Sequence, residues 1–471
     1  MKILLVAPIK ERFGGLEEAP PLGLGYLATA LRRNGYTVAI LDCVKKKITF
    51  EMFERYISQN DFDLVGITVY SSALKQVKRT LEIIKKTKPT MITIVGGPHP
   101  SAAPNHTLEY LKEADFAFRG EGEISFPLFV EYLQNHQTNR FKEIPGLVWR
   151  EGNKVVSNEP VIHPNIDDFD FPAWDLINPK DYGQPGSVVP KGWASIITTR
   201  GCPFYCTFCS THTIMGHRIR YRSLDRVIRE IKFLYSKYRI KNFTMLDENF
   251  TLNKQRVTDF CQKILNEKVK FKFMLPNGVR LDTLDEDLLK LMKQAGFMKR
   301  MAVGIESGSE RILKMIKKQL TKELIREKIE LMNKVGFQPI GFFILGFPTE
   351  TREEMQETIN FAMSLKLYRA AFTCLIPLPG TEIFNALVAS NELAPDFDFS
   401  NLTTDTVNYA PKGMSREELD KIRKKAIFKF HMRPRVIFSF LQDRSSFAFA
   451  AKKFWNLFVK SSSSRVRSKS V

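Results

Sequence analysis

Residues 194–209 read ASIITTRGCPFYCTFC, an apolar run of strand length that leads into three closely spaced cysteines. Cys202, Cys206 and Cys209 are separated by three and then two residues. Three thiolates can bind three irons of a 4Fe-4S cubane and leave the fourth iron open to a further ligand. The stretch therefore predicts a strand followed by a loop that holds an iron-sulfur cluster.

Other interpretations of the cysteines remain open at this point. A tetrahedral zinc site would need a fourth ligand, which His212 could supply, and a cluster that only transfers electrons would use the same thiolates. Unreactive buried thiols are the third alternative. Cys43 and Cys261 lie in apolar runs and are expected to pack in the core, whereas Cys374 ends a late apolar run and could face the site.

The cysteine stretch opens a part of the chain in which apolar runs alternate with helical segments. Such alternation is typical of a parallel sheet with helices between the strands. Six units of this kind predict a partial (β/α)6 barrel over residues 191–400, and such barrels carry their chemistry at the carboxyl ends of the strands. The five runs that follow the cysteines span residues 242–248, 271–278, 300–308, 338–346 and 369–380.

Residues 1–135 show a similar alternation and predict an α/β, doubly wound (Rossmann-like) domain with helices on both faces of a parallel sheet. Ligands bind such sheets at the carboxyl ends of the strands. We expect these ends at Pro8 and at residues 70–72, 96–98 and 120–123. A ligand-binding rim is therefore predicted there.

Residues 136–190 lose this rhythm. Seven prolines interrupt the segment, and residues 148–156 read VWREGNKVV, a hairpin-like pattern. We expect a linker that packs on both of its neighbours.

The composition is that of a globular chain with more than one core, since 44% of the 471 residues are hydrophobic. The apolar start MKILLVAP is too short for a signal peptide or a membrane span. Six cysteines, three of them within eight residues, do not form a disulfide framework, and a reducing compartment would keep them free for metal. A cytoplasmic location is therefore expected.

The formal net charge of +20 is concentrated at the C-terminal end of the chain. Residues 421–471 contain fourteen lysines and arginines against one acidic residue, Asp443. Residues 401–471 are expected to form a basic, helical C-terminal region. A helix over residues 447–460 would gather aromatic side chains on one side and lysines on the other.

This pattern is typical of a helix that lies on an anionic membrane surface. The alternative is a helix packed on the barrel, followed by a solvated end. The tail lacks a recognisable nucleic-acid module, so nucleic acid is not an expected partner. The aromatic side of the helix would contain Phe447, Ala451, Phe454, Trp455 and Phe458, and the basic side Lys452, Lys453 and Lys460.

Over residues 191–385 the chain resembles the radical S-adenosylmethionine (SAM) superfamily, through the C-x3-C-x2-C loop and the elements that follow it. The resemblance implies that SAM binds the open iron and that the aromatic residue before the last cysteine lies beside adenine. The motif DEN at residues 247–249 departs from the commoner Gly-Gly-Glu form and would receive the SAM ammonium group. The strings GIESGS at residues 304–309 and FFILGFPTE at residues 342–350 complete the match. The implied SAM contacts are Phe208, Asp247, Glu248, Glu306, Ser307 and Gly346.

Two of these residues also have a plain structural explanation. Glu306 could form a salt bridge at the barrel rim, and Gly346 could simply allow a turn. Both alternatives stay open at the level of sequence.

The N-terminal part resembles the cobalamin-binding domain that precedes the barrel in class B radical SAM enzymes. The segments that carry the resemblance read PPLGLGYLATALRRNG, DLVGITVYSS, IVGGPHPSAAP and FAFRGEGE. Small residues at strand ends let a nucleotide tail and a corrin edge approach the backbone. The chain has no Asp-x-His-x-x-Gly segment, which implies a cobalt without an axial histidine; a domain that binds no cobalamin is the alternative. The implied cobalamin contacts are Thr68, Ser71, Ser72, Gly96, Gly97 and Gly120.

Together the resemblances imply an enzyme with a 4Fe-4S cluster, SAM and cobalamin as cofactors, and a reductant such as ferredoxin or flavodoxin as partner. Cleavage of one SAM would give a 5'-deoxyadenosyl radical, and a second SAM would supply a methyl group for an unactivated carbon of a hydrophobic, lipid-like substrate. Ring or carbon-carbon bond formation without methyl transfer is the alternative. A methylthiotransferase is disfavoured because its N-terminal domain needs three cysteines and this one offers only Cys43. A cobalamin-binding regulatory protein would not need the cluster motif.

Overall fold

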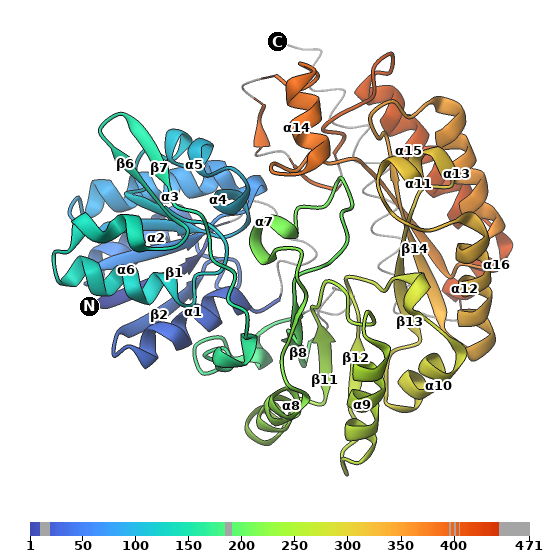
Figure 1. Ribbon diagram of the computed structural model, residues 1–471, viewed down its shortest axis with the longest axis horizontal. Helices are drawn as coiled ribbons and strands as arrows, with labels where there is room; N and C mark the ends of the chain where they lie inside the picture. The colour runs from blue at the N-terminus through green and yellow to red at the C-terminus, as the bar shows by residue number, and fades with distance from the viewer. Residues whose placement is uncertain (10–18, 184–190, 395–396, 400–401, 405, 442–471) are drawn as a thin grey trace.

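The computed structural model describes residues 1–9, 19–183, 191–394, 397–399, 402–404 and 406–441. Two α/β units lie side by side (Figure 1). The N-terminal unit is built on one sheet, and the strands of the larger second unit form an open, curved wall with helices outside it. The predicted α/β fold class is confirmed.

The N-terminal sheet has seven strands in the order β2-β1-β3-β4-β5-β6-β7. The first five run parallel, and β6 and β7 form an antiparallel hairpin at the edge. The hairpin comes from the proline-rich segment 136–190, so part of this expected linker extends the sheet. The strands are β1 Lys2–Ala7, β2 Thr37–Asp42, β3 Leu64–Thr68, β4 Ile92–Gly96, β5 Phe116–Phe118, β6 Leu147–Glu151 and β7 Lys154–Ser157.

Alternation along β1 explains why helices cover both faces of this sheet. Leu4 and Val6 are buried on one face, whereas Ile3 and Leu5 are buried on the other. Successive side chains of a strand point to opposite faces, so each face needs its own apolar cover. Helices α2 and α3 cover the first face, and α1 and α6 cover the second. The helices are α1 Leu22–Arg33, α2 Phe50–Gln59, α3 Leu74–Thr87, α4 Pro98–Ala102, α5 Pro104–Tyr110 and α6 Ser125–Gln134.

The second unit contains six parallel strands in two groups of three, β12-β11-β8 and β13-β14-β15. Bridges from Phe273 to Phe297 and from Val279 to Val303 join the groups into a partial parallel barrel, as predicted. A short antiparallel pair, β9 and β10, encloses the cysteine loop. The strands are β8 Trp193–Ile196, β9 Thr199–Arg200, β10 Arg220–Tyr221, β11 Asn242–Met245, β12 Lys272–Met274, β13 Arg300–Glu306, β14 Gln338–Leu345 and β15 Arg369–Cys374.

Several barrel helices begin at polar residues that cap them. Asn253, Asp285 and Thr321 each accept a hydrogen bond from a backbone N–H of the first turn, which satisfies an amide that the helix itself leaves unpaired. Thr351 and Glu354 cap each other's backbone in a reciprocal capping box. The helices are α7 His212–Met215, α8 Leu224–Tyr238, α9 Lys254–Leu265, α10 Glu286–Gln294, α11 Glu310–Met315, α12 Lys322–Val335, α13 Arg352–Ser364, α14 Glu382–Ala389, α15 Arg416–His431 and α16 Pro434–Leu441.

The first part of the basic C-terminal region packs on the barrel. Helix α15 lies along β15, where the rings of Phe430 and Phe372 are 6.3 Å apart, and Leu419 is fully buried. The predicted aromatic stripe over residues 447–460 lies outside the described residues. Within the part of the chain that the structure describes, no helix is long and apolar enough to cross a membrane.

Buried ion pairs join the two units directly beside the cysteine loop. Arg200 of β9 pairs with Glu121 at 3.0 Å and with Glu123 at 2.6 Å. Arg220 of β10 pairs with the same Glu121 at 2.6 Å. Burial by itself would raise the pKa of Glu121, but the bonds to Arg220 and Arg200 outweigh it and lower the pKa, so the carboxylate stays charged. The glutamates follow β5, at the predicted ligand-binding rim.

A segment beyond the barrel returns to the N-terminal unit. Phe399 packs against His99 and His106, with ring centroids 5.3 and 4.9 Å apart. The neighbouring Asp398 pairs with Lys75 at 2.9 Å. The carboxyl ends of the N-terminal strands are therefore covered in part by chain that follows the barrel.

Replacement of Glu121 with alanine is expected to lower the free energy of unfolding by about 3–5 kcal/mol, because it leaves Arg200 and Arg220 buried with less compensating charge. Unfolding in guanidinium chloride, followed by circular dichroism, measures the loss. Glu159→Ala is the matched control: this carboxylate pairs with Arg119 but is 86% exposed, so a change below about 1 kcal/mol is expected. Equal effects of the two substitutions would contradict a stabilising role for the buried pairs.

Candidate functional site

The three cysteines lie in the loop between β9 and β10, at the carboxyl end of the first barrel strand. Gly201 has a φ of +89°, and a Cβ there would lie 2.3 Å from the carbonyl oxygen of Arg218, so the turn requires glycine. Cys202, Cys206 and Cys209 are free thiols and partly exposed. The loop therefore presents all three thiols at the end of the barrel where chemistry is expected.

This donor set fits an iron-sulfur cluster. Burial raises the pKa of Cys206, and the nearby Lys318 acts in the opposite direction, so a positive charge lies where thiolates are needed. Among the described residues no three His, Cys, Asp or Glu side chains are close enough to hold a single metal ion. In a 4Fe-4S cluster each thiolate binds a different iron, so the ligands stand farther apart than those of one zinc. His212, considered above as a zinc ligand, is hydrogen-bonded through Nδ1 to the Cys209 carbonyl oxygen at 3.0 Å.

The other three cysteines, Cys43, Cys261 and Cys374, are buried in the apolar cores. Burial raises the pKa of each of these thiols to about 12. Cys374 lies on the buried face of β15, with the side chains that pack against the helices.

The first two residues of the DEN motif separate at the end of β11. Asp247 is buried and accepts a hydrogen bond from the backbone N–H of Thr198 at 2.6 Å, which ties β11 to the end of β8. Glu248 is partly exposed and accepts a hydrogen bond from the Thr211 hydroxyl at 3.1 Å, two residues after Cys209. Glu248 therefore lies beside the cysteine loop, whereas the oxygens of Asp247 are engaged in the fold.

Asn249, the third residue of the motif, is buried with an unsatisfied side chain. Neither its amide nitrogen nor its amide oxygen has a hydrogen-bond partner among the described residues. A buried polar group that stays unpaired costs about 1–3 kcal/mol. An ordered water or a bound polar group is therefore expected at Asn249. The sequence motif contains this residue but gives no sign of a separate role for it.

Phe208 lies beside the loop that follows β14, since its ring centroid is 5.9 Å from that of Phe347. Gly346 in the same loop has a φ of +84°, and a Cβ there would lie 2.5 Å from the Leu419 side chain of α15. Glu350 holds the loop by accepting N–H bonds from Gly346 at 2.6 Å and from Phe347 at 3.0 Å. The turn and the close packing both require a glycine here, and its contact with SAM stays a prediction.

Glu306 follows a bulge in β13, has a φ of +69°, and pairs with Lys318 at 2.8 Å. This ion pair is the rim salt bridge considered above. Lys318 also influences the pKa of Cys206, and no local motif marks this lysine as part of the site. Ser307 is fully buried and hydrogen-bonded to the Thr358 hydroxyl of α13 at 3.1 Å, so its side chain is used in packing.

The six residues expected to contact cobalamin lie at the carboxyl ends of β3, β4 and β5 or directly after them, and all are partly exposed. Gly97 has a φ of +103°, and a Cβ there would lie 3.2 Å from Thr68 Cγ2 and 3.4 Å from the backbone nitrogen of Val69. The missing side chain leaves a backbone cradle that a ligand can approach closely. The edge therefore fits a corrinoid bound at the strand ends.

This rim lies next to the cysteine loop. Helix α7, which begins three residues after Cys209, packs beside α4, which begins directly after Gly97 (Figure 1). A Cβ on Gly380 would lie 2.8 Å from Thr213 Cγ2 and 3.3 Å from Ala102 Cβ, so the loop after β15 closes on both helices. The candidate cluster site and the candidate cobalamin site are therefore neighbours.

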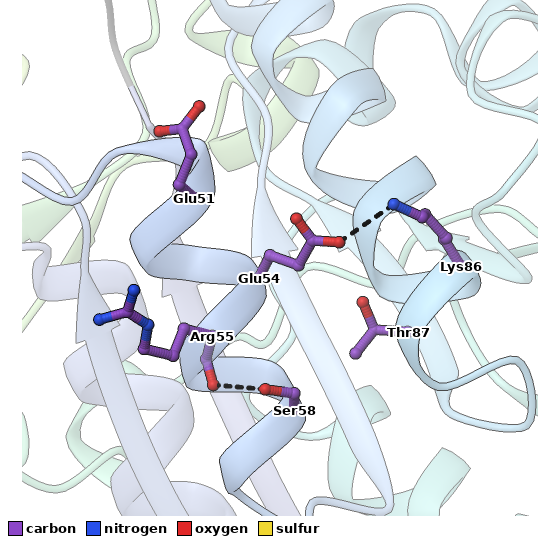
Figure 2. A pocket seen from close by; sticks show the side chains of 6 residues that line it. All are labelled: Glu51, Glu54, Arg55, Ser58, Lys86 and Thr87. Carbon is purple, nitrogen blue, oxygen red and sulfur yellow. Dashed lines mark hydrogen bonds and ion pairs between the residues drawn. The ribbon is translucent and has the colours of Figure 1, made fainter.

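Figure 2 shows a surface hollow that has no part in this arrangement. It lies between α2 and α3, on the helical face of the N-terminal unit rather than at the strand ends. Glu54 pairs there with Lys86 at 3.2 Å, and the Ser58 hydroxyl donates to the Arg55 carbonyl oxygen at 2.8 Å. An open, polar hollow of this kind lacks the apolar lining of a typical small-molecule site.

Two family models match the chain, the Radical SAM superfamily over residues 196–362 and the B12 binding domain over residues 16–130. An uncharacterized methyltransferase of Pyrococcus horikoshii is 36% identical, and the match covers 95% of this chain and 96% of the relative. The anaerobic magnesium-protoporphyrin IX monomethyl ester cyclase of Cereibacter sphaeroides is 28% identical over 89% of this chain and 68% of the relative.

The fold also matches a solved structure, the radical SAM methyltransferase TsrM from Kitasatospora setae with cobalamin and a 4Fe-4S cluster bound. The TM-score is 0.72 at 17% identity, and the match covers 92% of this chain and 89% of the other. The expected cofactors, a 4Fe-4S cluster, SAM and cobalamin, are confirmed by the family matches. The chain belongs to the radical SAM superfamily, as a cobalamin-dependent enzyme of the methyltransferase class.

Proposed function

We propose that this enzyme transfers a methyl group to an unactivated carbon of a hydrophobic, lipid-like substrate. The observation that carries the proposal is the apolar inner face of the barrel wall formed by β14 and β15. Exposure alternates strictly along both strands.

The outer face of this wall packs against helices. Phe343 and Phe372 are buried there and stack with ring centroids 5.2 Å apart. The inner face carries mostly apolar side chains that stay partly exposed, and a hydrophobic substrate would remove such surface from water. The partly exposed side chains of this face are Ile340, Phe342, Ile344, Ala371 and Thr373, together with Gln338 and Arg369 at the amino ends of the two strands.

The charges near the cysteine loop also favour an uncharged substrate. Lys318 pairs with Glu306, at 2.8 Å. Arg280 pairs with Asp282 at 2.9 Å and lies 3.6 Å from the ring centroid of Phe204. A charged substrate would have to compete for the partners of these ion pairs, whereas an apolar substrate would leave both pairs intact.

The bound cofactors would supply one-electron cleavage of SAM and transfer of its methyl group. In our proposal the three loop cysteines hold the cluster, Glu248 receives the SAM ammonium group, and Phe208 packs beside adenine. Asp247, Glu306, Ser307 and Gly346 are the other proposed SAM contacts, and Asp247 and Gly346 also keep the surrounding loops in place. The proposed cobalamin contacts are those of the rim: Thr68, Ser71, Ser72, Gly96, Gly97 and Gly120.

Ring or carbon-carbon bond formation with the same cofactors is the second candidate. It is favoured by the Cereibacter sphaeroides relative, which is named a cyclase and matches most of this chain. Transfer of a labelled methyl group separates the two candidates.

The cluster assignment predicts that anaerobically reconstituted protein binds about one 4Fe-4S cluster and releases 5'-deoxyadenosine from SAM when reduced with dithionite. Cys202→Ala, Cys206→Ala and Cys209→Ala should each abolish both properties, because each removes a thiolate ligand. Iron and sulfide analysis and chromatography of the nucleoside measure them. Cys261→Ala, at a buried cysteine, is the control and should keep both. Full activity in all three loop variants would disprove the assignment.

Methyl-deuterated SAM tests the substrate class. Reconstituted enzyme with cobalamin is incubated separately with the organic and the aqueous extract of cells, and products are analysed by mass spectrometry. We expect a deuteromethyl product from the organic extract, because apolar compounds partition there, and none with Cys206→Ala. Label confined to the aqueous extract would contradict a hydrophobic substrate. An unlabelled new product from the organic extract would favour the ring-forming candidate.

We further propose that the enzyme works in the cytoplasm at the inner face of an anionic membrane, with ferredoxin or flavodoxin as reductant. The support for the membrane surface is the concentration of basic residues in the C-terminal tail and the aromatic stripe that the sequence predicts over residues 447–460. A hydrophobic substrate would be held in the same membrane.

The full-length protein is expected to co-sediment with anionic vesicles at low salt and to dissociate as salt screens the charges. Because Phe430 packs on the barrel, the test truncation removes only residues 442–471 and should weaken binding. Exchange of Lys452, Lys453 and Lys460 for glutamate should weaken it similarly while keeping the aromatic residues. Equal sedimentation of all three proteins, or indifference to lipid charge, would rule out the membrane role.

A further inference from the structure

A chain of three side chains runs from the rim of the N-terminal sheet into its core. The Ser71 hydroxyl, just after β3, is hydrogen-bonded to His99 Nδ1 at 2.9 Å. His99 Nε2 is in turn hydrogen-bonded to His106 Nδ1 at 3.0 Å. Ser71 is partly exposed, whereas His99 has no exposed surface. The chain therefore links a hydroxyl at the ligand-binding edge to a fully buried ring.

His99 is uncharged in this position. Burial lowers its pKa to about 3, and the neighbouring His106 acts in the same direction. Burial lowers the pKa of His106 as well. A neutral imidazole has one N–H, so one nitrogen of His99 donates and the other accepts. With both nitrogens engaged, His99 offers no lone pair to cobalt, in line with the missing axial-ligand motif.

A backbone hydrogen bond and neighbouring aromatic rings also hold the His99 ring in place. Its backbone N–H donates to the Val69 carbonyl oxygen at 3.0 Å, which ties the start of α4 to the end of β3. Phe399 packs edge-on against both histidines, and His106 stacks on Tyr110 with an angle of 14° between the rings. Turning the His99 ring away from Ser71 would break two hydrogen bonds in a buried setting, where unpaired polar groups are costly.

We propose that His99 is a positioning residue that aims the Ser71 hydroxyl at a polar group on the periphery of bound cobalamin, either a corrin amide or the nucleotide phosphate. The proposal rests on Ser71 being at the cobalamin rim, as in the proposed function. An apolar core at this place would need no imidazole pair. A fully satisfied buried chain instead sets one orientation for the hydroxyl at its exposed end. The direction of that hydroxyl is then decided by His99 rather than by solvent.

The test measures the Kd of hydroxocobalamin by absorbance titration of cobalamin-free, full-length protein, so the readout is not activity. The amide of asparagine reaches about as far from the backbone as Nδ1 of histidine, and that of glutamine about as far as Nε2. His99→Asn therefore keeps the bond to Ser71, whereas His99→Gln keeps only the bond to His106. We expect His99→Gln and Ser71→Ala each to weaken binding about three- to tenfold, the effect of one hydrogen bond, and His99→Asn to bind nearly as wild type.

Two comparisons separate positioning from simple packing. The double variant Ser71→Ala with His99→Gln should bind no more weakly than Ser71→Ala alone, because both changes remove the same interaction. His136→Gln, at an exposed histidine of the same unit, is the control and should leave the Kd unchanged. Cobinamide, which lacks the nucleotide tail, identifies the partner group: an equal loss with cobinamide assigns a corrin amide, and a loss seen only with cobalamin assigns the nucleotide phosphate.

Wild-type protein that fails to bind hydroxocobalamin would contradict the proposed function itself. Wild-type binding together with an unchanged Kd for Ser71→Ala would overturn only the role of His99. Additive losses in the double variant, or a loss in His99→Asn equal to that in His99→Gln, would show that His99 acts through packing. Circular dichroism and the 4Fe-4S absorbance verify folding. If His99→Gln does not fold, the other two variants still test the proposal. Ser71→Ala should weaken binding of hydroxocobalamin, and His99→Asn should not.

Discussion

Buried charge pairs between the loop after β5 and the two arginines on either side of the cysteine loop hold the two units together. Glu121 bridges Arg200 and Arg220, and both arginine side chains are buried. The Arg200 guanidinium also lies 5.0 Å from the ring centroids of Tyr26 and Phe169, in α1 and in the segment between the units. The Arg200 side chain, at the start of the cysteine loop, therefore contacts the loop after β5, helix α1 and the segment between the two units.

The same arrangement brings the two candidate cofactor sites next to each other. The strand ends of the N-terminal sheet carry the glycine cradle at Gly97, and the first barrel strand carries the cysteines. Helices α4 and α7 start from these two places and pack against each other. Phe399, from beyond the barrel, then closes over the histidines of the rim. The candidate corrinoid site is therefore bordered by both units.

Near the cluster loop, many polar groups hold the scaffold rather than face a ligand. Asp247 ties two strand ends together, Ser307 fastens a strand to α13, and Glu350 closes the turn at Gly346. Burial raises the pKa of Glu350 to about 7, although backbone N–H bonds from Phe347 and Gly346 oppose this shift. Such bonds place the loops accurately, as a site that combines several cofactors requires. The inner face of β14 and β15 is the surface to which we assign the substrate in the proposed function.

The α/β class, the six barrel units, the cysteine loop and the rim glycines could all be predicted from the sequence, because they depend on local periodicity, on ligand spacing and on backbone freedom. The sequence also placed Phe208 inside the cysteine loop and Glu248 at the end of a barrel strand. Three contacts could not be predicted: Glu121 with Arg200, 79 residues away, Lys318 with Glu306, and His99 with Ser71. Such pairs follow from how strands and helices pack, and packing brings together side chains that no local pattern connects.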